Sequence, residues 1–454
     1  EKKRWVEGDY SGPARVSGSA GTGKTVVALH RAVFLARTNP DARVLLTPFS
    51  DPLASSLTAK LKILIRDEPR IAERIEVHAM NTVGRRLFQR NFGPPEMASP
   101  GIIEELITAA AGDGHPFHLR FLISEWHEVV DAWQLGSWEA YRDVVRLGRK
   151  TRLPENQRAK LWAVFERVKE ALKKRGMITY PELFGRLTEF YADGQHLPFD
   201  FIVVDEAQDV SVAQLRFLAA LGSDRPNCLF FTGDLGQRIF QQPFSWKALG
   251  VDIRGRSKTL RINYRTSHQI RMQADRLLGP EISDVDGNTE KRWGTISVFN
   301  GPNPEVMVLD DERDEIDKVC SWIEERLEEG IQPHEIGIFV RSSTEMNRAC
   351  AAVRQTGVSY KVLDENVETT TGHISVSTMH LAKGLEFRAV AVMACDDEVI
   401  PLQNRVETVA DVADLEEVYN TERHLLYVAC TRARDYLLVT GVDPTSEFLD
   451  DLLI

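Results

Sequence analysis

The segment of this chain that most constrains its fold is the glycine-rich run GSAGTGKT, Gly18 to Thr25. It fits the pattern G-x-x-x-x-G-K-[ST], and it lies between a short apolar run at 14–17 and a helical run at 26–36. Glycines at such a junction let backbone N–H groups approach phosphate oxygens, and the helix N-terminus adds positive potential. A chance glycine turn is the alternative, but the flanking strand and helix favour a phosphate-binding loop.

This loop predicts a site for a nucleoside triphosphate with Mg²⁺. Lys24 is expected to reach the β- and γ-phosphates, and Thr25 is expected to bind Mg²⁺. The expected cofactor-binding residues of the loop are Gly18, Ser19, Ala20, Gly21, Thr22, Gly23, Lys24 and Thr25.

A second acidic motif, VVDEAQD at 203–209, follows the apolar run FIVV. An acidic residue at a strand end can hold the Mg²⁺ of a phosphate-loop site, which is the role expected for Asp205. Glu206 is then placed to orient and deprotonate the attacking water. Two solvated carboxylates at a strand end are the alternative, and the accompanying glycine loop makes that interpretation weaker.

Apolar runs in both halves of the chain predict two α/β units with parallel sheets. The predicted strands are RVLLTP at 43–48, FIVV at 201–204, CLFFTGD at 228–234, TISVF at 295–299, IGIFV at 336–340, ISVST at 374–378, AVAVMA at 389–394 and YLLVTG at 436–441. The stretch from about 93 to 195 is instead helical in pattern, with Gly176 as a helix C-terminal signal. We therefore expect a helical domain inserted in the first α/β unit.

Bulk properties restrict the class of protein. A chain of 454 residues exceeds one ordinary core, and 43% hydrophobic with 27% charged residues is typical of a globular protein in water. The net charge of −11 counts mildly against nucleic-acid binding but does not describe how charge is distributed. The five scattered cysteines indicate a reducing compartment, hence the cytoplasm, and no apolar run reaches membrane-spanning length. Because the first residue is Glu1, a fragment or a processed chain is expected.

Further blocks follow the two motifs in a fixed order. They are TGDLGQRIF at 232–240, LRINYRT at 260–266, STMHLAKGLEF at 377–387 and LLYVACTRA at 425–433. Together the blocks resemble the UvrD/Rep/PcrA branch of the superfamily 1 helicases, and they cover nearly the whole chain. The resemblance implies ATP-driven movement on single-stranded or partly duplex DNA, with unwinding in the 3'-to-5' direction.

The resemblance also implies a fold of two RecA-like domains with the ATP site in the cleft between them. The expected parts are domain 1A at 1–92 and 196–257, a helical 1B insertion at 93–195, and domain 2A at 258–454. In the family a 2B domain is inserted before the fifth motif. Here only residues 364–373 separate the expected strand YKVL from ISVST, so we expect a motor without 2B that translocates as a monomer.

Several residues match family positions around the nucleotide. Gln237 is expected to sense the γ-phosphate, and Arg265 and Arg432 are expected to stabilise charge on the transferred phosphoryl group. Tyr264 matches the tyrosine that stacks on adenine, and Glu386 matches a glutamate near the nucleotide. A surface salt bridge is the alternative for any one of them.

Candidates for nucleic-acid contact come from the same resemblance and from the stacking of bases on aromatic rings. They are Thr47, Phe49, Phe240, Trp246, Thr378 and His380. Core packing is the alternative for Phe240 and Trp246, and a structural histidine that fixes its loop is the alternative for His380.

The chain departs from the family pattern at three places. Residues 1–17 contain no glutamine, although the family has an adenine-reading glutamine before the phosphate loop. Asn81 stands where a histidine is common, and Gln242 stands where a base-stacking tryptophan is expected. The first departure puts base recognition in doubt, and the other two put part of the nucleic-acid track in doubt.

Other functions remain open at this level. A nucleic-acid-stimulated ATPase that remodels a protein–nucleic-acid complex would share every ATP motif, and RNA could replace DNA as the track. A nuclease–helicase is disfavoured because about twenty residues follow Ala433, and a small-molecule kinase would not need the block around Arg432. We expect no metal beyond Mg²⁺ and no membrane partner, whereas a protein partner or an upstream domain would fit.

Overall fold

Two six-stranded parallel sheets form the frame of the molecule. The computed structural model describes residues 2–66, 68–112, 115–144, 153–234, 237, 244–279, 281–291, 294–365, 367–407 and 412–453. Within them the strand orders are β3-β2-β6-β7-β1-β8 and β13-β18-β17-β14-β16-β15. The chain is thus an α/β protein with two parallel-sheet lobes, as the sequence predicts.

The first sheet is built from short strands, of which the four central ones are mostly apolar and buried on both faces. Its strands are β1 (Ala14–Ser17), β2 (Val44–Thr47), β3 (Ile75–Val77), β6 (Phe201–Val204), β7 (Leu229–Gly233) and β8 (Ser257–Thr259). Its helices are α1 (Lys2–Val6), α2 (Lys24–Thr38), α3 (Asp51–Leu64), α4 (Pro69–Ala72), α5 (Met80–Phe92), α10 (Tyr180–Tyr191) and α11 (Val212–Gly222). Because β1, β6 and β7 are adjacent and parallel, their carboxyl ends lie at one edge.

The second sheet repeats this arrangement. Its strands are β13 (Glu305–Leu309), β14 (Ile336–Val340), β15 (Tyr360–Val362), β16 (Ile374–Thr378), β17 (Phe387–Val392) and β18 (Ala433–Val442). Its helices are α12 (His268–Asp275), α13 (Glu312–Glu328), α14 (Met346–Gln355), α15 (Gln403–Val406), α16 (Val412–Cys430) and α17 (Glu447–Leu453). Cys395 and Cys430 are among its fully buried residues, and all five cysteines are unpaired.

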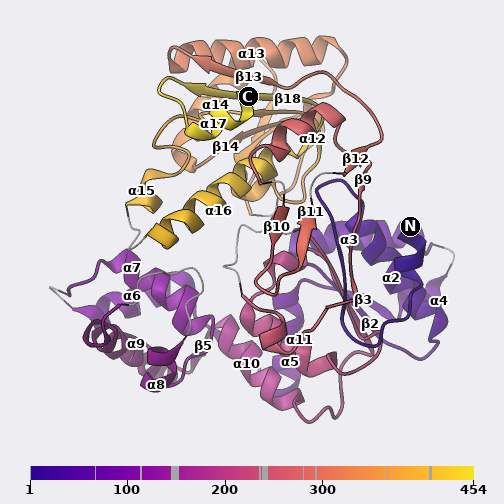
Figure 1. The fold of residues 1–454 in the computed structure, drawn as a ribbon, viewed down its shortest axis with the longest axis vertical. Helices are drawn as coiled ribbons and strands as arrows, with labels where there is room; N and C mark the ends of the chain where they lie inside the picture. Colours follow the sequence, from indigo (N-terminus) through magenta and orange to yellow (C-terminus); the bar gives the residue numbers. More distant parts are fainter. Residues whose placement is uncertain are drawn as a thin grey trace.

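A separate helical lobe lies beside the first sheet (Figure 1). It consists of α6 (Pro100–Ala111), α7 (Leu119–Glu125), a π-helical turn at Trp126–Asp131, α8 (Trp138–Asp143) and α9 (Glu155–Arg175). Trp126, Tyr141 and Phe165 are buried in a hydrophobic cluster of its own. Gly176 ends α9 with φ 66°, as its place in the sequence predicts. The chain enters and leaves through the parallel pair β4 (Glu96–Met97) and β5 (Met177–Ile178).

One predicted strand is wrong. TISVF at 295–299 was expected to be a buried strand, but only β12 (Ile296–Ser297) forms, and it pairs with β9 (Ile262–Asn263) outside the large sheets. Ile296 and Val298 are 65% and 55% exposed, so this segment buries too little apolar surface to be a core strand. Strand β13, which was not among the predicted strands, instead joins the second sheet by pairing with β18.

Packing also shifts the limits of the three lobes. Helix α10 lies within the range 93–195 expected for the helical insertion, yet its buried face, Leu183, Phe184 and Leu187, joins the core of the first sheet. Strand β8 crosses the limit expected after residue 257, since its pairing with β1 runs through Thr259. By packing, the first lobe therefore includes α10 and extends to Thr259.

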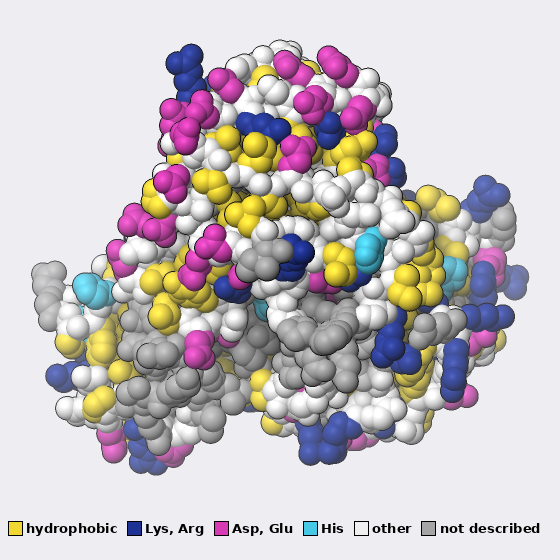
Figure 2. Space-filling model, turned by 45° about the horizontal axis from the view of Figure 1, so that its top comes forward, with side chains coloured by type: hydrophobic (Ala, Val, Ile, Leu, Met, Phe, Trp, Pro, Cys, Tyr) yellow, Lys and Arg dark blue, Asp and Glu magenta, His cyan; other side chains and the backbone are white. Residues whose placement is uncertain are grey.

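Charge is unevenly distributed over the surface. In the view of Figure 2, acidic side chains gather over the upper lobe, whereas Lys and Arg side chains concentrate along the lower and right-hand edges. Helix α13, at the top of Figure 1, begins with the acidic residues Glu312, Asp314 and Glu315. Much of the negative charge thus lies on one lobe, and the net charge says little about the remaining surface. Among the residues that the structure describes, no helix is both long and apolar enough to cross a bilayer.

A buried ion cluster fixes α16 to the second sheet. Glu422 is fully buried and accepts from Arg341 Nε and Nη2 at 2.5 and 2.6 Å, and from Arg405 Nη1 at 2.8 Å. Burial acts to raise the pKa of Glu422, but Arg341 and Arg405 outweigh it, so the pKa lies below its usual value.

We predict that Glu422→Gln lowers the free energy of unfolding at pH 7 by about 3–5 kcal/mol, because it leaves Arg341 buried without its charge partner. The measurement is urea denaturation. The carboxylate's contribution is fully present above the unfolded-state pKa of about 4.3 and is lost as pH falls through the lower folded-state pKa, so the two proteins should converge in acid.

The matched control is Glu305→Gln, which breaks a partly exposed 2.9 Å ion pair with Lys318. This loss should cost less than about 1 kcal/mol. Equal losses in the two variants would contradict a structural role for the buried cluster.

Candidate nucleotide-binding site

The glycine loop lies between β1 and α2, at the carboxyl edge of the first sheet. Gly21 and Gly23 have φ values of 78° and 84°, which side chains other than glycine rarely adopt. A Cβ atom on Gly21 would lie 2.3 Å from Asn263 Oδ1, so the second lobe approaches the loop closely. The loop thus requires glycine both for its conformation and for the neighbour that covers it.

Lys24 points back into this loop. Its Nζ donates to the carbonyl oxygens of Gly18 and Ser19 at 2.7 and 3.0 Å, and it lies 3.8 Å from Asp234 Oδ2. The side chain is buried, so a cation is held where the loop curves around. A buried ammonium in a cradle that a Cβ would fill fits the phosphates of a nucleotide.

Asp205 follows β6 and meets Thr25 at the start of α2. Burial and the neighbouring Glu206 raise the pKa of Asp205, while hydrogen bonds with Thr232 and Thr25 act to lower it. The bond from Thr232 Oγ1 is 2.5 Å long. A carboxylate and a hydroxyl that face each other here supply the hard oxygen ligands that Mg²⁺ prefers, so the two residues predicted for Mg²⁺ are brought together.

Glu206 has the left-handed backbone conformation, with φ 56°, which turns it out of the line of β6. Gln208 Nε2 donates to its carboxylate, and Lys383 Nζ lies 3.7 Å from Oε2. Burial acts to raise the pKa of Glu206, but the positive charges of Lys383 and Lys24 outweigh it, and the pKa lies below its usual value. The carboxylate is therefore ionised at neutral pH, as a general base must be.

The second lobe contributes Arg432 to the same site. Its Nη2 donates to Gln237 Oε1 at 3.3 Å, and Gln237 Nε2 donates to Asp234 Oδ2 at 2.8 Å. Burial and the nearby Arg265 lower the pKa of Arg432 to about 10, so it remains a cation at neutral pH. Two predicted residues, Gln237 and Arg432, are thus in contact across the lobes.

The remaining nucleotide candidates lie closer to solvent. Arg265 and Glu386 form an ion pair with each other. Tyr264 is 51% exposed, and its backbone N–H donates to Gly21 O at 2.9 Å. The aromatic ring is therefore held beside the phosphate loop and is about half-exposed.

Sequence reasoning missed Lys383, the lysine of the block STMHLAKGLEF. Its Nζ contacts Asp209 Oδ2, lies near Glu206 and donates to Gln237 O at 3.2 Å. Asp234 was missed as well, although it joins Lys24 to Gln237. Both residues stand in blocks that resemble the family's motifs, and a charged residue inside such a block was the available signal.

The residues predicted to contact nucleic acid are not seen to form one site, in contrast to those predicted to bind the nucleotide. Phe240 lies outside the described residues. Trp246 packs against the first core, with its ring edge-to-face with Phe231 at 4.9 Å, so its packing is explained without a base. Thr47 is buried and its carbonyl accepts from Asp205 N at 3.0 Å, whereas Phe49 and Thr378 are half-buried.

His380 lies in the turn Met379–Ala382 that follows β16, near the ion cluster of α16. Burial and the positive charge of Arg341 lower the pKa of His380 to about 4. The imidazole is therefore neutral at physiological pH, which suits a hydrogen bond rather than a charge contact with phosphate.

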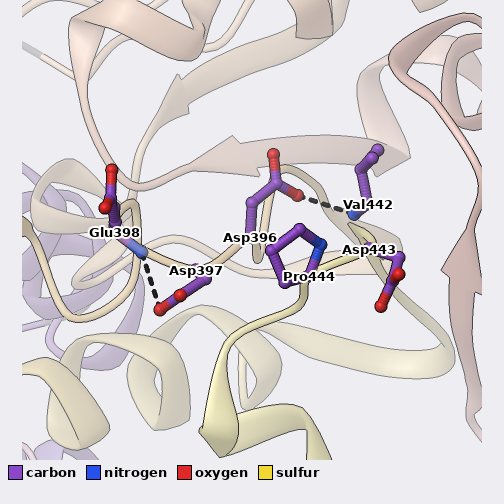
Figure 3. A pocket seen from close by; sticks show the side chains of 6 residues that line it. All are labelled: Asp396, Asp397, Glu398, Val442, Asp443 and Pro444. Atoms are coloured by element: carbon purple, nitrogen blue, oxygen red, sulfur yellow. Dashed lines mark hydrogen bonds between the residues drawn. The ribbon is translucent and has the colours of Figure 1, made fainter.

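A cavity of about 330 Å³ lies elsewhere in the second lobe, near the carboxyl ends of β17 and β18 (Figure 3). It is lined by Asp396, Asp397, Glu398, Val442, Asp443 and Pro444. Asp396 accepts from Val442 N at 2.7 Å, and Asp397 accepts from Glu398 N at 3.0 Å. Its carboxylates would repel triphosphate, so the glycine loop remains the nucleotide candidate. Within the described ranges, no three His, Cys, Asp or Glu side chains are grouped to hold a metal ion.

Comparison with known proteins agrees with this geometry. The model of the UvrD/REP helicase N-terminal domain matches residues 1–242, and that of the UvrD-like helicase C-terminal domain matches residues 364–443. The chain is 25% identical to the ATP-dependent DNA helicase UvrD2 of Mycobacterium tuberculosis over 376 residues, which are 77% of this chain and 53% of that protein. It is 22% identical to a probable DNA helicase of Mycoplasma pneumoniae over 255 residues, 54% of this chain and 44% of that protein.

The chain therefore spans about half the length of these curated relatives. A shorter match, 38% identical over 100 residues, links it to the ATP-dependent DNA helicase UvrD1 of Mycobacterium leprae and covers 20% of this chain and 12% of that protein. Since the N-terminal family model alone covers more than half of the chain, the protein belongs to the UvrD/REP helicase family.

Proposed function

We propose that this protein is an ATP-driven DNA motor that translocates on single strands in the 3'-to-5' direction and unwinds duplex ahead of it. The observation that carries the proposal is the meeting of both lobes at one buried site, where Arg432 and Lys383 of the second lobe approach Gln237 and Glu206 of the first. The proposed division is 1A at 1–92 and 196–257, 1B at 93–195 and 2A at 258–454, with the limits adjusted to packing as described above.

In the proposed mechanism the loop amides and Lys24 hold the phosphates, and Thr25 and Asp205 hold Mg²⁺. The ion, when bound, neutralises charge on the β- and γ-phosphates. Glu206 accepts a proton from the attacking water, since its carboxylate is ionised and lies at the carboxyl edge of the sheet. Arg432, with Arg265, stabilises the negative charge of the transferred phosphoryl group.

Movement of the two lobes is proposed to follow from contacts that join them at the nucleotide site. Gln237 contacts both Asp234 of the first lobe and Arg432 of the second, so it is placed to report the γ-phosphate to both. Nucleotide binding would then draw the lobes together, and loss of the γ-phosphate would release them. An alternating grip on the strand gives directed steps. Tyr264 and Glu386 are proposed to contact the rest of the nucleotide.

DNA is the proposed track because the relatives of this chain are named as DNA helicases. The 3'-to-5' direction rests on the resemblance to the UvrD/Rep/PcrA branch. Thr47, Phe49, Phe240, Trp246, Thr378 and His380 remain the proposed contacts, and the packing of Trp246 and the burial of Thr47 make these two the weakest. The unpaired cysteines are consistent with the proposed cytoplasmic location.

The connection between β15 and β16 supports a motor without a 2B domain at this point. The described residues of this connection, 363–365 and 367–373, form a loop without helix or strand. The chain then returns to the sheet at Ile374, which pairs with Tyr360. A loop of this length cannot form a domain. We therefore propose that the protein translocates as a monomer, and that restraint or loading comes from a partner.

We predict that the protein at concentrations where it is monomeric displaces a strand from a duplex with a 3' single-stranded tail but not from one with a 5' tail. Strand displacement and DNA-stimulated ATP hydrolysis are measured together, with RNA tails as a further arm. Hydrolysis without displacement would identify the remodelling ATPase instead, and activity only after self-association would contradict the monomer.

We predict that Glu206→Gln retains ATP binding but lowers kcat at least about 100-fold, because the general base is removed while the phosphate contacts remain. Binding is measured by equilibrium fluorescence with a labelled ATP. Lys24→Ala is the comparison, since it should lose hydrolysis through the phosphate contact itself. Near-normal turnover in Glu206→Gln would exclude Glu206 as the base.

We predict that Arg432→Lys lowers kcat about 10³-fold with little change in KM, as expected for a contact made in the transition state. Lysine keeps the positive charge but lacks the planar guanidinium group with its several N–H donors. Because Arg432 also donates to Val428 O at 2.9 Å, thermal melting of the variant must match wild type for the result to count. A higher KM with unchanged kcat would make Arg432 a ground-state ligand.

A further inference from the structure

A lysine from the start of the chain lies over the aromatic ring beside the phosphate loop. Lys2 Nζ is 3.9 Å from the centroid of Tyr264, whose ring is half-exposed. The same ammonium would lie 2.5 Å from a Cβ atom on Gly23, so it also touches the phosphate loop. Loop, ring and ammonium therefore form one surface. A nucleotide with its phosphates in the loop carries its base within reach of that surface.

The backbone that carries Lys2 is held in place. Arg31 of α2 donates from Nη1 to the carbonyl oxygens of Val6 and Gly8, both at 2.7 Å. Tyr10 stacks on Trp5 with 5.6 Å between ring centroids, and its hydroxyl donates to Trp5 O at 2.8 Å. Since α1 is thus anchored to α2, the position of Lys2 is a property of the fold, and only its flexible stem needs to move.

The ammonium group of Lys2 differs in its hydrogen-bonding capacity from the side-chain amide of the adenine-reading glutamine that the UvrD/Rep/PcrA branch has before its phosphate loop. A glutamine both donates and accepts, which matches adenine, where N7 accepts and the N6 amine donates. An ammonium group only donates. It matches guanine, whose N7 and O6 both accept, and it has no acceptor for the adenine N6 amine. Stacking of a base on Tyr264 would displace the ammonium from the ring face toward the edge of the base.

We propose that Lys2 is a base-specificity residue that makes this site accept 6-oxopurine triphosphates, GTP and ITP, at least as well as ATP. The inference rests on the proposed nucleotide hydrolysis at this site. It deepens that function by naming the substrate class that the base surface selects. Lys2 contacts the base edge through N7 and O6, and Tyr264 supplies the stacking face.

The test compares wild type, Lys2→Gln and Lys3→Gln. Lys3 is the matched control, because its side chain is 83% exposed and lies 3.8 Å from Glu7 on the same helix. Two quantities are measured with ATP, GTP and ITP: kcat/KM for hydrolysis with single-stranded DNA, and the Kd of the fluorescently labelled nucleotides without DNA.

Wild type is expected to use GTP and ITP with kcat/KM no lower than that for ATP. Lys2→Gln should shift the GTP-to-ATP ratio toward ATP by about tenfold in both kcat/KM and Kd, the size expected of a paired base-edge contact. Lys3→Gln should leave the ratio unchanged. The 7-deaza analogue of GTP, which lacks the N7 acceptor, should lose most of its advantage in wild type and little in Lys2→Gln.

A wild-type preference for ATP over GTP of tenfold or more would overturn the proposal, as would a ratio that Lys2→Gln does not change. A shift of equal size in Lys3→Gln would overturn it too, since it would reflect the charge of the helix rather than a base contact. Absence of hydrolysis with every triphosphate would instead count against the proposed function, and the Kd measurements would still decide the specificity.

Discussion

The site depends on the compensation of buried charge. Asp205, Glu206 and Asp209 follow a single strand; Asp205 and Asp209 are buried and Glu206 is half-buried, and isolated carboxylates are costly in such places. Their cations come from two places, since Lys24 belongs to the first lobe and Lys383 to the second. The carboxylates that follow β6 therefore help to hold the two lobes together, because Lys383 of the second lobe is one of their cations. Any ligand that adds negative charge here competes for the cations that maintain this contact.

Much of this arrangement follows from the sequence, for a physical reason. Parallel strands that are buried on both faces are mostly apolar along their length, and such runs are conspicuous in a single sequence. The polar residues directly after them must then meet at the carboxyl edge of the sheet. For this reason Lys24, Thr25, Asp205 and Glu206 could be grouped without coordinates. The family resemblance implied that Gln237 and Arg432 lie near the γ-phosphate, and their direct contact was found only in the structure.

The parts that could not be predicted depend on tertiary context. TISVF has the composition of a strand, but whether Ile296 and Val298 are buried is decided by neighbours far away in the chain. Helix α10 has the pattern of its helical neighbours, and only its packing assigns it to the first core. Lys383 and Lys2 were missed for the same reason, because a lysine shows its role only when its partner across the fold is known.

The helical lobe joins the first lobe through two adjacent strand segments. The chain enters at β4 and returns at β5, and these two segments are hydrogen-bonded side by side, with Ala98 N donating to Ile178 O at 2.9 Å. Entry and exit thus form one double-stranded stalk. An appendage on such a stalk can be lengthened, shortened or exchanged between relatives while the order of strands in the sheet beneath is preserved.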